Sequence, residues 1–225
     1  MSQFERVIAS PAGTSALSTN KVIRNTYALL SMTLLFSAAC AGIAMALNLP
    51  YPGMAITLVG YFGLLWLTTR NANSAKGLIF IFALTGFMGM TLGPVLNAYI
   101  SHYANGGQLV MMAMGATGAL FLGLSGYALR SRKDFSFMGG MLFTGVWVAF
   151  LAGIGAMVFH MPGLMLAVSA MFVVLMSGLI LFQTSQLVHG GETNYILATI
   201  GLYVSVFNLF TSLLQLLGVF GGDDN

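Results

Sequence analysis

Seven long apolar stretches follow one another along the chain, separated by short polar links. They cover residues 25–47, 53–69, 78–100, 108–129, 138–158, 164–183 and 195–218. A helix needs roughly 20 such residues to cross about 30 Å of hydrocarbon, whereas a strand of a membrane barrel alternates polar and apolar positions over about ten residues. The stretches therefore predict an all-α membrane protein, a bundle of seven transmembrane helices.

The amino-acid composition agrees with a membrane domain. Of the 225 residues, 58% are hydrophobic and 6% are charged, whereas a soluble globular domain has about 25% charged residues. The links are too short to hold a soluble domain, so residues 21–219 are expected to form one seven-helix transmembrane domain. Residues 1–20 are rich in Ser, Thr and Ala and contain Pro11, which we expect to prevent a regular helix and to leave a flexible tail. Residues 220–225 form a short C-terminal tail.

The basic residues define an orientation, because all eight lie on one side of the predicted membrane. They are Arg6, Lys21, Arg24, Arg70, Lys76, Arg130, Arg132 and Lys133. Since basic loops remain in the cytoplasm, the N-terminal tail is predicted to be cytoplasmic, and seven crossings place the C-terminal tail on the far side. No clustered basic face appears, so we expect the lipid bilayer and no nucleic acid as a partner of these residues.

The last apolar stretch carries a regular series of small and polar residues. Gly201, Ser205, Asn208, Ser212 and Gln215 recur at spacings of four, three, four and three, which places them on one face of a helix. Polar groups that face lipid have no partners, so this stripe should face protein or water. The last helix is therefore predicted to be buried among the others. Its stripe is either a structural seam or a wet path or binding cleft.

Glycine is abundant inside the third, fourth and fifth stretches. The positions are Gly86, Gly89 and Gly93, then Gly115, Gly118 and Gly123, then Gly139, Gly140 and Gly145. Helices in lipid associate through close packing, and small residues let their backbones approach. We therefore expect a tight bundle with glycine at its internal contacts.

Candidate catalytic and metal-binding residues are few. Gly123 to Gly126 reads G-x-S-G, as in intramembrane serine proteases, with Ser125 as the nucleophile and His189 as a base on the same side of the membrane. Short Gly and Ser strings also arise by chance in glycine-rich helices, and we expect no catalytic residue. The histidines, including His102 and His160, are dispersed, so neither a metal site nor a cofactor is expected. Cys40 stands alone, which excludes an intramolecular disulfide.

The link between the sixth and seventh stretches, residues 189–194, contains two glycines and no basic Lys or Arg. The glycines permit a sharp reversal, and Thr193 or Asn194 can cap the last helix. A second interpretation is an inner switch, because His189 near Glu192 can change charge around neutral pH.

Four segments resemble, in order and spacing, the Bax inhibitor-1 family, most closely its bacterial YccA-like branch. They are ALTGFMGMTLGPVLNAY at 83–99, SRKDFSFMGGMLFTG at 131–145, LFQTSQLVHGGETNYI at 181–196 and LYVSVFNLFTSLLQLLG at 202–218. The resemblance extends from about Lys21 to Gly218. It implies seven helices with the last one central, in a bacterial inner membrane with a periplasmic C-terminus. It also implies association with the FtsH membrane protease and restraint of its action on other membrane proteins.

Other members of the family resemble pH-sensitive calcium leak channels, whose gate uses two acidic residues on the sixth and seventh helices. The matching positions here are Gln183 and Ser205. An amide and a hydroxyl do not titrate, so the acidic gate is missing. The two side chains can still hydrogen bond and latch the two helices. The resemblance thus predicts a modulator of an FtsH-type protease, and the alternative is a calcium or proton leak channel.

Overall fold

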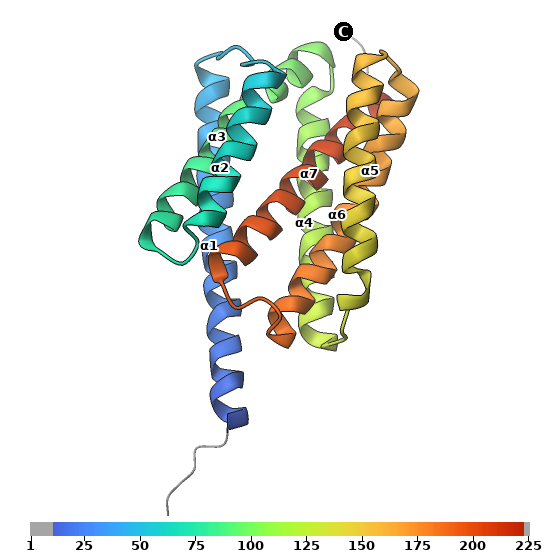
Figure 1. Cartoon of the computed structure of the whole chain (residues 1–225). Helices are drawn as coiled ribbons and strands as arrows, with labels where there is room; N and C mark the ends of the chain where they lie inside the picture. Colours follow the sequence, from blue (N-terminus) through green and yellow to red (C-terminus); the bar gives the residue numbers. More distant parts are fainter. Residues whose placement is uncertain (1–10, 223–225) are drawn as a thin grey trace, which may run out of the picture.

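The computed structural model describes residues 11–222, with side chains from Thr19 onward, and this part of the chain is helical without strands (Figure 1). The elements are α1 (Pro11–Ala46), α2 (Met54–Arg70), α3 (Ala75–His102), α4 (Gly106–Ser131), the 3₁₀ turn η1 (Ser136–Met138), α5 (Gly139–Val158), α6 (Pro162–His189) and α7 (Tyr195–Gly221). Within this range six helices are long and apolar enough to cross a membrane, and α2 is a shorter apolar helix of 17 residues.

The first helix begins earlier than the sequence predicts. Residues 11–20, expected to be part of an irregular tail, are helical in the structure, so that boundary was wrong. Pro11 occupies the first helical position, where its fixed φ suits the helix and its missing N–H has no helical acceptor to lose. The remaining tail residues, 1–10 and 223–225, lie outside the described residues.

The helices differ in how many neighbours they contact. Helix α7 runs obliquely across the bundle in Figure 1 and contacts α1, α3, α4 and α6. It has the largest buried share of the six long helices. In contrast, α2 packs mainly against α3, and α5 packs mainly against α6, so these two helices lie at the periphery.

Glycines on α3 let α1 approach closely. A Cβ atom at Gly89 would overlap the backbone carbonyl of Ser37, and a Cβ atom at Gly93 would lie 2.8 Å from the carbonyl oxygen of Ala41. Gly86 faces the Phe36 ring in the same contact. The expectation of close packing is therefore confirmed for α3.

The glycines of α4 behave differently. A Cβ atom at Gly115, Gly118 or Gly123 would meet nothing within 4 Å, so the expectation that they lie at internal contacts was wrong. On α5 the result is mixed. Gly139 and Gly145 face Phe182 and Leu175 of α6, whereas Gly140 is open. Sequence spacing could not separate these cases, because both faces of a lipid-embedded helix are apolar.

A buried hydroxyl cluster joins α7 to α1 and α3. The Tyr203 hydroxyl donates to the Thr85 carbonyl oxygen at 3.3 Å and lies 2.7 Å from Ser37 Oγ. Tyr203 is 1% exposed, so its hydroxyl has no access to water and depends on these partners. The cluster fixes the depth at which α7 crosses the other two helices.

Asparagine side chains tie the helix ends together. At the end with the basic loops, Asn194 Oδ1 accepts from the N–H groups of Ile196 and Leu197, so Asn194 is the predicted cap of α7. Its Nδ2 donates to the Ala72 carbonyl and to Asn73 Oδ1, in the link between α2 and α3. One residue therefore starts α7 and attaches it to a neighbouring link.

We predict that Gly89→Ala lowers the free energy of unfolding by about 1–3 kcal/mol, because the added methyl group would overlap backbone that has little room to move. The matched control is Gly115→Ala, which meets open space and should be neutral or slightly stabilising. Thermal unfolding of both variants in detergent measures the difference. Equal stability of the two variants would contradict the close α1–α3 contact.

We predict that Asn194→Ala destabilises the protein more than Asn194→Ser. Serine retains an oxygen that caps α7 but loses the bonds to the α2–α3 link, whereas alanine loses both sets. The expected cost of alanine is about 1–2 kcal/mol for the cap alone, with the link bonds in addition. If the two variants unfold at the same temperature, the side chain does not act as a cap.

Candidate functional site

The polar stripe of α7 is enclosed, and its residues serve two cavities. None of its five members is exposed, and Ser205 and Ser212 are fully buried. Gly201, Ser205 and Asn208 line one cavity, while Gln215, about two turns further along, lines another. The stripe residues therefore do not line one continuous path: Ser212, between Asn208 and Gln215, lines neither cavity.

The first cavity lies between α2, α3, α5, α6 and α7 and has a volume of about 440 Å³. Its polar lining residues are Thr57, Tyr61, Thr91, Gln183, Ser205 and Asn208, and its aromatic ones include Phe62, Phe87, Trp147 and Phe150. Among the described residues that form its wall, none is Asp, Glu, Lys, Arg or His. The cavity therefore offers neutral hydrogen-bonding groups within an apolar enclosure.

Gln183 and Ser205, the positions that match the acidic gate of other family members, come together in this cavity. Ser205 Oγ donates to Gln183 Oε1 at 3.3 Å and joins α7 to α6. A Cβ atom at Gly201 would lie 3.2 Å from Gln183 Nε2, so the glycine leaves room for the amide. The bond is present, while a gating role for the pair remains a hypothesis.

Two further residues complete the polar part of the cavity. Asn208 lines the cavity, and its Nδ2 donates to the Val204 carbonyl of the preceding turn at 2.8 Å. This bond uses the amide nitrogen and leaves the amide oxygen available as an acceptor. Tyr61 comes from α2, and sequence reasoning missed it. The sequence offered little reason to select it, because Tyr61 is a single tyrosine at the middle of a short apolar stretch.

The second cavity, also of about 440 Å³, lies at the far end of α7 beside the link between α5 and α6. Gln215 lines it together with His160 and Pro162. Here the stripe residue is already paired, because Ser169 Oγ donates to Gln215 Oε1 at 2.6 Å. This part of the stripe is a helix-to-helix contact.

Ser125 has hydroxyl neighbours instead of a base. Its Oγ lies 3.3 Å from Thr184 Oγ1, which in turn lies 3.2 Å from the Tyr27 hydroxyl. This chain of hydroxyls links α4, α6 and α1. A serine nucleophile needs a base within hydrogen-bond reach, whereas in the described part of the chain His189 contacts the carbonyl oxygens of Ser185 and Arg132.

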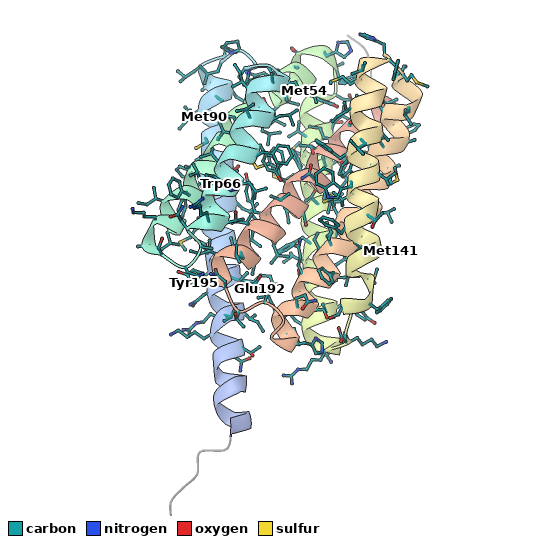
Figure 2. All side chains as sticks on the ribbon, in the orientation of Figure 1. Met54, Trp66, Met90, Met141, Glu192 and Tyr195 are labelled. Atoms are coloured by element: carbon teal, nitrogen blue, oxygen red, sulfur yellow. The ribbon has the colours of Figure 1, made fainter. Side chains whose placement is uncertain are left out.

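His189 and Glu192 also have separate partners. His189 Nδ1 lies 2.9 Å from the Ser185 carbonyl oxygen, and its Nε2 lies 3.1 Å from the Arg132 carbonyl oxygen. Carbonyl oxygens only accept, so a ring nitrogen that carries a proton donates to its carbonyl partner. Glu192, which Figure 2 shows in the link before Tyr195, accepts from the Asn194 N–H at 2.7 Å. The inner switch formed by His189 and Glu192 remains a prediction.

The end of α6 holds the link between α4 and α5. Ser185 Oγ accepts from the Phe135 N–H at 3.0 Å and donates to the Lys133 carbonyl at 3.2 Å. Next to it, hydrogen bonds from Ser136 lower the pKa of the Asp134 carboxyl group, with a smaller contribution from the charge of His189. Sequence reasoning missed Ser185.

The histidines do not form a metal site. Within the described part of the chain, no three His, Cys, Asp or Glu side chains come together. His102 and His160 lie at the opposite end of the bundle from His189.

We predict that Ser205→Ala lowers the free energy of unfolding by about 1 kcal/mol, the usual value of a helix-to-helix hydrogen bond in a membrane. The control is Ser212→Ala, which makes the same substitution at another buried serine of α7. In a double-mutant cycle, Gln183→Leu should add little once Ser205 is alanine. Fully additive effects of the two changes would show that the hydrogen bond contributes nothing.

Comparison with known proteins agrees with this architecture. The family model described as "Inhibitor of apoptosis-promoting Bax1" matches residues 19–222. The chain is 50% identical over 216 residues to "Modulator of FtsH protease YccA" of Escherichia coli strain K12, covering 96% of this chain and 98% of the relative. The same identity and coverage hold for "Inner membrane protein YccA" of a second Escherichia coli strain.

A more distant relative comes from an animal. "Protein lifeguard 4" of Mus musculus is 28% identical over 204 residues, which cover 87% of this chain and 83% of the relative. The resemblance inferred from the sequence segments is confirmed by these matches along almost the whole chain. The chain is a multi-pass membrane protein that belongs to the Bax inhibitor-1 family, in its YccA-like branch.

Proposed function

We propose that this protein modulates an FtsH-type membrane protease and thereby the turnover of other membrane proteins. The observation that carries the proposal is the 50% identity, over nearly the full length of both chains, to the protein named modulator of FtsH protease. The aligned region covers 96% of this chain and therefore includes the surfaces of the helices as well as their packed faces. A surface that recognises a membrane partner can therefore be shared as well as the fold.

The arrangement of polar groups supports binding rather than catalysis. Ser125 lies in a chain of hydroxyls, and the cavity beside Ser205 has a neutral wall. A modulator of this kind needs a stable bundle and a recognition surface, and it needs no active site. We propose that the protein is not an enzyme.

We further propose that the basic end of the bundle lies in the cytoplasm and that α7 is its central element. Contacts from Asn194 to Ala72 and from His189 to Arg132 bring the links of α2–α3, α4–α5 and α6–α7 to the same end. The basic residues of those links therefore share one side, as the positive-inside rule requires of a cytoplasmic face. The burial of α7 and its contacts with four helices support its central place.

The leak-channel alternative draws no support from the cavity at the gate-equivalent positions. Calcium prefers six to eight oxygen ligands, including carboxylates, and proton transfer needs groups that titrate. Gln183 and Ser205 supply one amide and one hydroxyl, already bonded to each other. We therefore propose a modulator.

We predict that the tagged full-length protein co-isolates an FtsH-type AAA protease from native membranes in mild detergent. A second multi-pass protein with the same tag is the control. Raising the level of this protein should also lengthen the half-life of a membrane-protein substrate of that protease. Absence of the protease from the isolate, together with an unchanged substrate half-life, would refute the proposal.

We predict that purified protein in liposomes gives calcium and proton fluxes no higher than empty liposomes. The measurement uses ion-sensitive dyes trapped inside the vesicles. Robust flux that Asn208→Leu abolishes would favour the channel, because Asn208 lines the cavity at the middle of α7.

A further inference from the structure

We propose that the cavity between α2, α5 and α7 binds a neutral, lipid-soluble amphiphile with a hydroxyl head group, such as a long-chain alcohol. This inference goes beyond the proposed function and does not depend on it. It rests on unpaired polar groups, their depth in the bundle, the apolar rim and the absence of charge.

Three polar groups on the cavity wall have unused hydrogen-bonding capacity. Within residues 19–222, the Tyr61 hydroxyl, Gln183 Nε2 and Asn208 Oδ1 are without a hydrogen-bond partner. None of these three atoms is completely buried, because within residues 19–222 the completely buried side-chain atom without a partner is Thr26 Oγ1. A polar group left unpaired in an apolar medium costs several kcal/mol, so these groups favour a ligand that pairs with them.

The unpaired groups lie far from bulk water. Tyr61 is at the middle of α2, which covers residues 54–70, and Asn208 is at the middle of α7, which covers residues 195–221. The middle of a spanning helix lies at the depth of the hydrocarbon core. A molecule that reaches these groups from the bilayer must itself dissolve in lipid.

The rim of the cavity is open to acyl chains and is aromatic. Phe62 of α2 is 44% exposed and Trp147 of α5 is 48% exposed, although both line the cavity. The Phe62 and Phe150 rings approach edge to face with centroids 6.1 Å apart, where α2 and α5 meet across the rim. In the view of Figure 1, α2 lies to the left and α5 to the right of the middle of α7, and each packs mainly against one neighbour. A lipid chain can therefore enter between α2 and α5.

The chemistry of the wall selects an uncharged head group. Without Asp, Glu, Lys, Arg or His among the described lining residues, a charged head would stay unpaired in a medium of low dielectric. The amide N–H of Gln183 donates, the amide oxygen of Asn208 accepts, and the Tyr61 hydroxyl does both. A hydroxyl group both donates and accepts, so it matches this set.

The volume favours a small molecule over a partner helix. A cavity of about 440 Å³ lies within the usual range of roughly 300–1,000 Å³ for small-molecule sites. A single 5.4 Å turn of a helix about 10 Å across would already fill roughly this space. The cavity therefore holds a chain or a compact amphiphile, and it is too short for a transmembrane helix.

The experiment labels the purified full-length protein in nanodiscs with a 16-carbon alcohol that carries a diazirine and an alkyne. The acid and the amine of the same chain length serve as charged comparison probes. We expect saturable labelling of α2, α5 and α7 peptides by the alcohol, competed by unlabelled hexadecanol and weak with either charged probe. Peptide mapping by mass spectrometry reads the result.

Tyr61→Phe and Asn208→Leu should each reduce the saturable labelling about fivefold, which corresponds to one lost hydrogen bond of about 1 kcal/mol. Tyr61→Phe keeps the ring and the fold, so an unchanged melting temperature separates lost binding from misfolding. Gln215→Leu is the matched control, because it makes the same kind of change on α7 at the second cavity, and it should leave labelling unchanged.

Three results would overturn the inference. One is labelling that never saturates and spreads over the outer faces of all helices. Another is equal labelling by the alcohol, the acid and the amine. The third is unchanged labelling of both Tyr61→Phe and Asn208→Leu. Each outcome is independent of protease association, because the assay contains this protein and lipid alone.

Discussion

The structure depends on one constraint: hydrocarbon offers no hydrogen bonds, so polar groups at membrane depth must find partners inside the bundle. Buried polar groups lie on several helices, and those of α7 show the consequence. Tyr203 bonds to α1 and α3, Ser205 bonds to α6, and Gln215 bonds to Ser169. Because each bond is directional, together they fix how α7 crosses its neighbours, while apolar side chains fill the space between.

Close backbone packing supplies the second source of order. Gly89 and Gly93 bring α3 against α1, which leaves no room for a methyl group at either position. At the basic end, Asn194 and His189 attach the links to one another. Helix α1 packs mainly against α3, and α7 packs mainly against α6, α4 and α1, whereas α2 and α5 each pack mainly against one neighbour. The cavity lies between those two peripheral helices, and the rings of Phe62 and Phe150 approach each other at its rim.

The cavity departs from the rule that organises the rest. Its wall retains unpaired groups on Tyr61, Gln183 and Asn208 at a depth where pairing is normally complete. This chain has an amide and a hydroxyl, Gln183 and Ser205, at the two positions where the family resemblance implies an acidic gate. Neutral groups cannot respond to pH by titration, but they can bind a neutral ligand. The same site in the fold can therefore serve different chemistry.

The sequence by itself determined the helices, the membrane class and the family, because apolar runs of this length joined by short links permit few alternatives in lipid. It also identified Asn194 as a cap and the α7 stripe as enclosed. The tertiary structure alone decided which glycines contact a neighbouring helix and that residues of the stripe line two cavities. It also decided that Tyr61 lines the same cavity as Gln183 and Asn208. The physical reason is that apolar faces look alike in a sequence, and the partner of each face is set by contacts between residues far apart in the chain.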